Sequence, residues 1–198
     1  MSRTFIVHVI NNLDRGGAET LLLNICREVT AKSEHFVFKV LLMEDSAFLG
    51  PEFKKANVDT QRQLIDCCEQ FGIQRFVYIS SPSVYNNYTD RFDIKESDDL
   101  PNPLINNYAV TKIEAEKLLQ DSVLSYVIIR PRALIGRGDT VIMPRVIRAH
   151  KEGRLRLMGD GKNRIDLTSV SNVVDVIWYR ARRGQRTLLR FASLSHRG

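Results

Sequence analysis

The sequence lacks the features that mark several large classes of protein. It has only three cysteines and four histidines in 198 residues, and the histidines do not recur at the spacing of metal ligands. No apolar run approaches the ~20 residues of a membrane span, and no basic-then-apolar signal peptide opens the chain. The adjacent Cys67 and Cys68 are expected to be small core residues. We therefore expect no metal site, no membrane span and a cytoplasmic location.

Excess positive charge is confined to one end of the chain. The net charge is +6, but residues 180–198 contain six arginines and no acidic residue, which leaves 23 basic and 23 acidic residues in 1–179. The charge therefore reflects a tail and not a binding face, so we expect no nucleic-acid partner. We expect this Arg-rich tail, residues 180–198, to be disordered.

Tyr108 and Lys112 are the most informative residues that the chain does contain. They lie four residues apart in segment 103–119, whose pattern predicts a helix. Residues at i and i+4 share a helix face, so the phenol and the ammonium should lie side by side. A nearby ammonium lowers the pKa of a phenol from its usual value of about 10. Such a phenol can exchange a proton with a hydroxyl or carbonyl near neutral pH.

Two predicted strands flank this helix. Segment 75–81 is an apolar strand that ends in Ser80 and Ser81, and segment 125–130 is a second one. A hydroxyl at the end of the first strand can hold the same substrate oxygen as Tyr108. The Tyr-x-x-x-Lys spacing alone equally fits a surface helix with a solvated lysine. The order strand, serines, helix and strand favours hydride-transfer chemistry at a carbon–oxygen bond.

Five motifs in order then carry a family resemblance. Over residues ~57–178 the chain resembles an extended short-chain dehydrogenase/reductase, of the NAD-dependent epimerase/dehydratase or the 3β-hydroxysteroid dehydrogenase type. The segments that match are Arg75–Tyr85, Tyr108–Lys112, Arg130–Asp139, Gly159–Asn163 and Asp166–Asp175.

The resemblance implies an α/β fold with a Rossmann-like doubly wound parallel sheet, a cofactor that is NAD or NADP, and a small-molecule substrate. It also suggests a homodimer formed through the helix that carries Tyr108. By motif position it assigns catalysis to Ser81, Tyr108 and Lys112. Cofactor-binding residues are then expected at Ser80, Tyr108, Lys112, Arg130 and Pro131, and substrate-binding residues at Ser81, Ser83 and Arg132.

The glycine turn with which that family begins, Gly-x-x-Gly-x-x-Gly, is missing from this chain. In its place the first residues predict a strand at 5–10, a helix at 18–30 and a strand at 36–42. The segment Val9–Glu19 resembles the start of a family-4 glycosyltransferase, with Gly16 and Gly17 in its turn. Those two glycines are the expected contacts of the cofactor's pyrophosphate, although a βαβ unit with a glycine turn explains the pattern equally well.

The chain is therefore interpreted as a glycosyltransferase-like βαβ unit at 1–55, a dehydrogenase-like region at 56–179 and the tail at 180–198. The Rossmann-like sheet would be incomplete, with a small C-terminal remnant of a substrate lobe. The favoured function is an NAD(P)-dependent oxidoreductase or epimerase that uses Ser81, Tyr108 and Lys112. The alternatives are a composite protein with little or no catalysis, and a glycosyltransferase-like sugar binder that uses Gly16, Gly17 and Glu19.

The residues around Asp166 bear on the substrate class. Sugar-nucleotide epimerases of the family carry an arginine directly before the corresponding aspartate, whereas here Ile165 precedes Asp166 and Arg164 stands one place earlier. A shift of one residue in an extended segment turns the side chain to the other face. The pattern is closer to the 3β-hydroxysteroid dehydrogenase-like branch, and it favours an alcohol/ketone pair on a non-nucleotide substrate.

Overall fold

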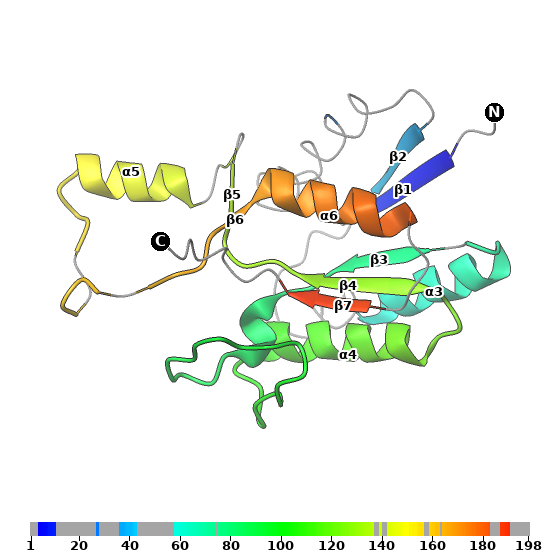
Figure 1. Cartoon of the computed structure of the whole chain (residues 1–198), viewed down its shortest axis with the longest axis horizontal. Coiled ribbons are helices and arrows are strands. Elements are labelled where there is room, and N and C mark those ends of the chain that lie inside the picture. The colour runs from blue at the N-terminus through cyan, green and yellow to red at the C-terminus, as the bar shows by residue number, and fades with distance from the viewer. Residues whose placement is uncertain are drawn as a thin grey trace. The chain divides into compact units, whose positions relative to one another are not determined.

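The structure is a computed structural model of the whole chain (Figure 1). It describes residues 4–10, 27, 36–42, 58–73, 75–136, 139, 142–156, 159–162, 164–182 and 187–190. The chain forms two compact units, one from residues 45–132 and 177–192, the other from residues 1–44, 133–176 and 193–198. The chain thus leaves and re-enters each unit, whereas the sequence predicted consecutive segments divided near residue 55.

The unit of residues 45–132 and 177–192 is built on a three-stranded parallel sheet. Its strands are β3 (Phe76–Ile79), β4 (Tyr126–Arg130) and β7 (Thr187–Arg190), in the order β3-β4-β7. The central strand β4 is buried from its second residue to its last, as expected for a parallel strand with neighbours on both sides. The two strands predicted at 75–81 and 125–130 are confirmed.

Strand β7 corrects the prediction of a disordered tail. Its backbone pairs with β4 in register, from Val127 opposite Thr187 to Arg130 opposite Arg190. This pairing satisfies an edge of β4 that would otherwise present unpaired backbone groups. The prediction of disorder is therefore wrong for Thr187–Arg190, because it rested on arginine content alone. Residues 183–186 and 191–198 lie outside the described residues.

Helices α3 (Thr60–Gln70) and α4 (Asn107–Asp121) lie on one face of this sheet (Figure 1). An apolar cluster joins them to the strands, with buried members Ile65, Leu119, Leu124 and Ile128. Cys68 packs against this cluster, but Cys67 is exposed. The prediction that both cysteines are core residues is wrong for Cys67, because a residue next to a buried one on a helix points away from the buried face.

Helix α4 begins where the side chain of Asn106 accepts a hydrogen bond from the Ala109 N–H at 2.9 Å. This N-cap satisfies one of the unpaired donors of the first turn, so the helix starts later than the predicted residue 103. The short 3₁₀ helix η2 (Pro82–Tyr85) packs on its first half. The two helices share a second core cluster, which contains Val84, Tyr85, Ala109 and Ile113.

The other unit holds two further pairs of parallel strands. Strands β1 (Thr4–Ile10) and β2 (Phe36–Leu42) pair with each other, which confirms both predicted strands. Of the predicted helix at 18–30, only Arg27 is described, and it is helical. Strands β5 (Leu134–Ile135) and β6 (Thr168–Ser169) form the second pair.

Two helices accompany these strands. Helix α5 (Met143–Lys151) has no buried residue. Helix α6 (Val170–Arg182) contains the boundary between the two units. Gly136 follows β5 with φ +155, and a Cβ there would lie 3.3 Å from Cβ of Val170, so a side chain at this position is disfavoured.

Within the described ranges every strand pairing is parallel, and helices are interspersed with the strands along the chain. The predicted α/β class is therefore confirmed. None of the described helices is long and apolar enough to cross a membrane. The cytoplasmic location stays a prediction.

Candidate active site

Ser81, Tyr108 and Lys112 all belong to one compact unit. Ser81 follows β3 and is the N-cap of η2, while Tyr108 and Lys112 lie on the first turns of α4. Because η2 packs on the same half of α4, the serine and the helix face that carries the phenol are brought together. The i, i+4 spacing that singled out the tyrosine and lysine is therefore realised on a helix.

The hydrogen bonds of Ser81 define which way its hydroxyl proton points. Its Oγ accepts from the backbone N–H of Ser83 at 3.3 Å and from the hydroxyl of Ser83 at 2.9 Å. A serine oxygen has two acceptor sites and one proton, so these two bonds leave the proton to be donated elsewhere. Ser81 is hydrogen-bonded to the side chain of Tyr108. The predicted joint action of these two hydroxyls on one substrate oxygen stays a prediction.

Lys112 is half-buried, with its ammonium between two aromatic rings. Its Nζ lies 5.0 Å from the ring centroid of Tyr78 and 5.7 Å from that of Tyr108, and it donates to the carbonyl oxygen of Ile79 at 3.4 Å. Burial lowers the pKa of Lys112 to about 8, and the carboxylate of Glu116 opposes this shift. The group therefore titrates close to neutral pH.

The pKa of Tyr108 corrects one sequence-based expectation. Burial raises this pKa above its ordinary value, and the hydrogen bond from Ser81 opposes the rise. Burial outweighs any opposing influence of the Lys112 ammonium, which lies over the ring of Tyr108. The prediction that the pKa of Tyr108 lies below its ordinary value is therefore wrong in direction, and the phenol is protonated at neutral pH.

Arg130 lies at the end of β4, and each nitrogen of its guanidinium bonds to a protein partner. Its guanidinium makes two hydrogen bonds to the carboxylate of Glu116, one of them Nε to Oε1 at 2.9 Å, and a third to the hydroxyl of Tyr85. The side chains of Arg130 and Glu116 are 4% and 2% exposed, so the ion pair is buried. The predicted contact between Arg130 and a cofactor stays a prediction, and its side chain is committed elsewhere.

The remaining predicted site residues are Ser80, Pro131, Arg132, Gly16 and Gly17. Ser80 is buried, and its Oγ has no hydrogen-bond partner among the described residues, while its N–H donates to Ile129 at 2.7 Å. Pro131 is buried and Arg132 is half-buried. Gly16 and Gly17 lie outside the described residues.

Sequence reasoning missed three residues of this site. Glu116 follows Lys112 by four residues, so its place on the catalytic face of α4 was available from spacing. Tyr85 stands inside a quoted motif but was given no role. Tyr78 contacts Lys112 from β3, and its buried hydroxyl has no partner in the described part of the chain.

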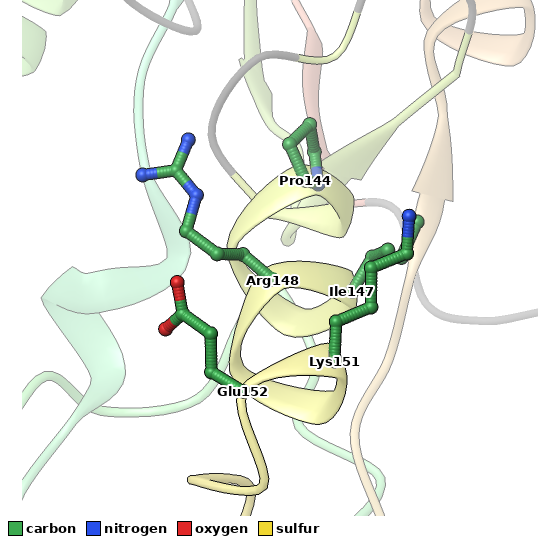
Figure 2. A pocket seen from close by; sticks show the side chains of 5 residues that line it. All are labelled: Pro144, Ile147, Arg148, Lys151 and Glu152. Atoms are coloured by element: carbon green, nitrogen blue, oxygen red, sulfur yellow. The ribbon is translucent and has the colours of Figure 1, made fainter.

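A separate pocket lies along helix α5. It is lined by Pro144, Ile147, Arg148, Lys151 and Glu152, all on this helix or directly after it (Figure 2). Arg148 and Glu152 project from the same side of the helix in Figure 2. No predicted site residue lines the pocket, so we assign it no chemistry.

Comparison with curated proteins finds reductases and dehydrogenases. A 2-alkyl-3-oxoalkanoate reductase of Stenotrophomonas maltophilia is 37% identical over 125 residues, which cover 61% of this chain and 38% of the reductase. A 3beta-hydroxysteroid-dehydrogenase/decarboxylase of Arabidopsis thaliana is 35% identical over 124 residues, which cover 60% of this chain and 28% of that protein. The chain therefore spans less than half the length of these two relatives.

Among solved structures, MoeE5 in complex with UDP-glucose and NAD matches with a TM-score of 0.70 and 25% identity, covering 96% of this chain and 76% of that one. This likeness confirms the Rossmann-like fold. A model of the NAD dependent epimerase/dehydratase family matches residues 45–188, more than half of the chain, so a nicotinamide dinucleotide is the family's cofactor, as predicted. The likeness of residues 1–55 to a glycosyltransferase stays a prediction. From residue 45 to residue 188, this chain belongs to the NAD dependent epimerase/dehydratase family.

Proposed function

We propose that this chain carries an NAD(P)-dependent oxidoreductase site that acts by hydride transfer at a hydroxyl or carbonyl carbon. Ser81, Tyr108 and Lys112 are its reacting groups. The observation that carries the proposal is the hydrogen bond between the hydroxyls of Ser81 and Tyr108, with the Lys112 ammonium over the Tyr108 ring. Two donors converge on one position and a titrating cation lies beside them, which is the arrangement that a developing alkoxide needs.

The protonation state of Tyr108 favours the direction of ketone reduction. Because burial raises its pKa, the phenol holds its proton at neutral pH and can deliver it to a carbonyl oxygen that becomes an alkoxide. The Ser81 proton, which is donated to Tyr108 in this structure, can turn to the substrate oxygen when that oxygen enters the site. The hydride that completes the reduction is the part supplied by the bound dinucleotide.

Lys112 acts on the phenolate that this proton transfer leaves behind. A cation beside Tyr108 stabilises that negative charge, and so opposes the rise in pKa that burial of the phenol causes. With a pKa of about 8, Lys112 is also suited to return a proton to Tyr108 near neutral pH. Its role is therefore in the transition state and in recovery, rather than in the resting protein.

The residues around Lys112 fit a nicotinamide ribose. An ammonium has three donor hydrogens, and among the described residues Lys112 has one acceptor, the carbonyl of Ile79. The buried Oγ of Ser80 is without a partner there. Both groups could hold ribose hydroxyls.

We expect this chain to bind the pyrophosphate of the dinucleotide more weakly than a chain with an intact glycine turn does. Residues 11–17 contain Gly16 and Gly17 but lack the Gly-x-x-Gly-x-x-Gly spacing that permits close backbone approach, although a helix N-terminus would still attract phosphate. We expect a loss of about 2–4 kcal/mol in binding relative to an intact glycine turn, the worth of one or two charge-assisted hydrogen bonds. Replacing residues 11–17 by a Gly-x-x-Gly-x-x-Gly turn should raise the affinity in calorimetric titration. Tight binding by the original chain, unchanged by the graft, would contradict this.

The substrate that we propose is a ketone or secondary alcohol without a nucleotide. The names of two relatives, an oxoalkanoate reductase and a hydroxysteroid dehydrogenase, support this class. The placement of Arg164 one residue before the usual position argues against a sugar nucleotide. Ser83 and Arg132 remain the proposed substrate contacts, with Ser83 acting through its bonds to Ser81.

Calorimetry with NAD and NADP, followed by turnover with 3-oxo acids, tests this function against its alternatives. A composite protein without a working site would bind neither nucleotide. A sugar binder governed by the first residues would lose its ligand in Gly17→Val and keep it in Tyr108→Phe. The proposal expects nucleotide binding in the wild type and in Tyr108→Phe, with turnover only in the wild type.

A homodimer through α4 is part of the proposal. The last turns of this helix expose Lys117 and Asp121, four residues apart. A two-fold axis across two antiparallel copies of α4 would pair each lysine with the aspartate of the other copy. Lys117→Glu should then shift the mass measured by light scattering from dimer towards monomer, and a monomeric wild type would rule the dimer out.

A further inference from the structure

A buried polar network joins three elements around the candidate active site. Arg130 from the end of β4 bonds to Glu116 on α4 and to the hydroxyl of Tyr85 on η2. Its guanidinium also stacks on the ring of Tyr85, 4.9 Å from the centroid. None of these three residues is a reacting group in the proposed chemistry. Their cost of burial is offset only while every member keeps its partners.

The position of Tyr85 in the chain makes this network relevant to Ser81. Tyr85 closes the η2 turn that Ser81 opens, so the two residues lie at opposite ends of one short helix. The ring of Tyr85 packs with Ala109 and Ile113, which directly follow Tyr108 and Lys112 on α4. The network therefore ties the turn that carries the serine to the helix that carries the tyrosine.

We propose that Tyr85 is a positioning residue, which holds the η2 turn through its hydrogen bond to Arg130 so that the Ser81 hydroxyl meets that of Tyr108. The proposal rests on the proposed function for its catalytic consequence. Its structural part, the placement of one hydroxyl against the other, does not need turnover. Tyr85 itself touches no reacting atom.

Apart from the packing of Val84 and Tyr85 and a bond from Arg91 to the Tyr85 carbonyl, few contacts fix the depth of η2. A four-residue 3₁₀ helix has few internal bonds, here two from Ser83 (N–H and hydroxyl) to Ser81 Oγ and one from the Asn86 N–H to the Ser83 carbonyl. Loss of the Tyr85 hydroxyl would leave a guanidinium N–H of Arg130 buried without a partner. The η2 turn can move so that this N–H finds another partner. A displacement of about 1 Å at a reacting group can lower a rate up to ~100-fold.

Tyr85→Phe is the decisive variant, because the phenylalanine ring keeps the packing against α4. The readout is the pKa of Tyr108, followed by NMR of ¹³C-labelled tyrosine and assigned with Tyr108→Phe. The Ser81 hydrogen bond lowers this pKa, so its loss raises the pKa. We expect Tyr85→Phe to raise the pKa of Tyr108 towards the value seen in Ser81→Ala. An unchanged titration in Tyr85→Phe overturns the proposal.

Two controls separate positioning from general destabilisation. Tyr88→Phe removes a hydroxyl from an exposed residue just beyond η2. Ile65→Val removes a buried methylene from the other core cluster. Both should leave the Tyr108 titration unchanged. A shift in Ile65→Val as large as that in Tyr85→Phe would also overturn the proposal, since any loss of stability would then suffice.

The kinetic arm tests the catalytic consequence. In Tyr85→Phe, kcat for a 3-oxo acid should fall about 10- to 100-fold with little change in KM for the nucleotide. If the wild type has no turnover, the proposed function fails, and the titration still decides whether Tyr85 positions Ser81. If the titration shifts while kcat is unchanged, the catalytic role of Tyr85 is overturned.

Discussion

The two halves of helix α4 differ in what they pack against. Towards its C-terminal end, Leu119 is fully buried among Ile65, Leu124 and Ile128, all of them apolar. Close packing of this kind stabilises the fold and carries no chemistry. The cluster joins α4 to α3 and to the sheet, and none of the predicted site residues belongs to it.

The N-terminal half of α4 packs against a turn and a polar network instead. Its apolar contacts are with η2, and its polar face presents Tyr108, Lys112 and then Glu116 at successive turns. Burial there shifts the pKa of Tyr108 up and that of Lys112 down, so each shift favours the uncharged form. Helix α4 therefore has a structural end and a chemical end. Mutations at the first should change stability, and mutations at the second should change catalysis.

The largest expected effect lies at the chemical end. Tyr108→Phe removes the proton donor but keeps the ring, so kcat should fall about 10²- to 10⁴-fold, the usual worth of a general acid. Nucleotide affinity and the midpoint of thermal unfolding should change little. Steady-state kinetics and calorimetry measure both, and a variant that retains wild-type kcat would remove Tyr108 from the mechanism.

Arg130→Met tests the buried ion pair between Arg130 and Glu116 of α4. It leaves the buried carboxylate of Glu116 without its partner, which should lower the free energy of unfolding by about 3–5 kcal/mol in urea denaturation. Replacing both residues, in Arg130→Met with Glu116→Leu, should recover much of that loss. Equal losses in the single and double variants would mean that the ion pair itself does not matter.

At the structural end the expected effect is on stability alone. Leu119→Ala removes a fully buried side chain and should cost about 2–5 kcal/mol of unfolding free energy. Because Leu119 lies two turns beyond Lys112, kcat per folded molecule should be unchanged at a temperature well below unfolding. A kcat loss comparable to that of Tyr108→Phe would abolish the distinction between the two ends.

The smallest expected effect is a pH dependence. Burial lowers the pKa of Lys112 to about 8, so between about pH 8 and pH 10 the unfolded chain binds a proton that the folded chain does not. That lysine therefore destabilises the fold below pH ~8, and the penalty is relieved as the pH rises through this window. The stability advantage of Lys112→Met over the wild type should shrink accordingly in denaturation at several pH values. A pH-independent difference would show that Lys112 has an ordinary pKa.

The parts of the site that the sequence predicted are those with local signals. The i, i+4 spacing of Tyr108 and Lys112 and the apolar run before Ser81 are readable within a few residues, and the structure has the helix and the strand. The pKa of Tyr108 could not be read this way, because its burial depends on elements distant in sequence. The spacing rule therefore predicted the neighbours correctly and the direction of the shift wrongly.

Other features escaped because they join distant residues. Arg130 bonds to Glu116, which is 14 positions away in the sequence, and to Tyr85, which is 45 positions away. No local sequence pattern predicts either contact. Strand β7 was missed because its arginine-rich surroundings suggested a tail, whereas its pairing with β4 depends on the sheet already being formed. Long-range pairing, rather than propensity, decided both outcomes.

The most direct test of the central claim follows the hydride itself. The wild-type protein is incubated with a 3-oxo acid and with NADH or NADPH that carries deuterium at the transferred position, and the product is analysed by mass spectrometry. We expect one deuterium at the new alcohol carbon, and a greatly reduced yield in Tyr108→Phe and Ser81→Ala. Absence of deuterated alcohol with either nucleotide across 3-oxo acids and ketosteroids, or equal yields in all three proteins, would contradict it.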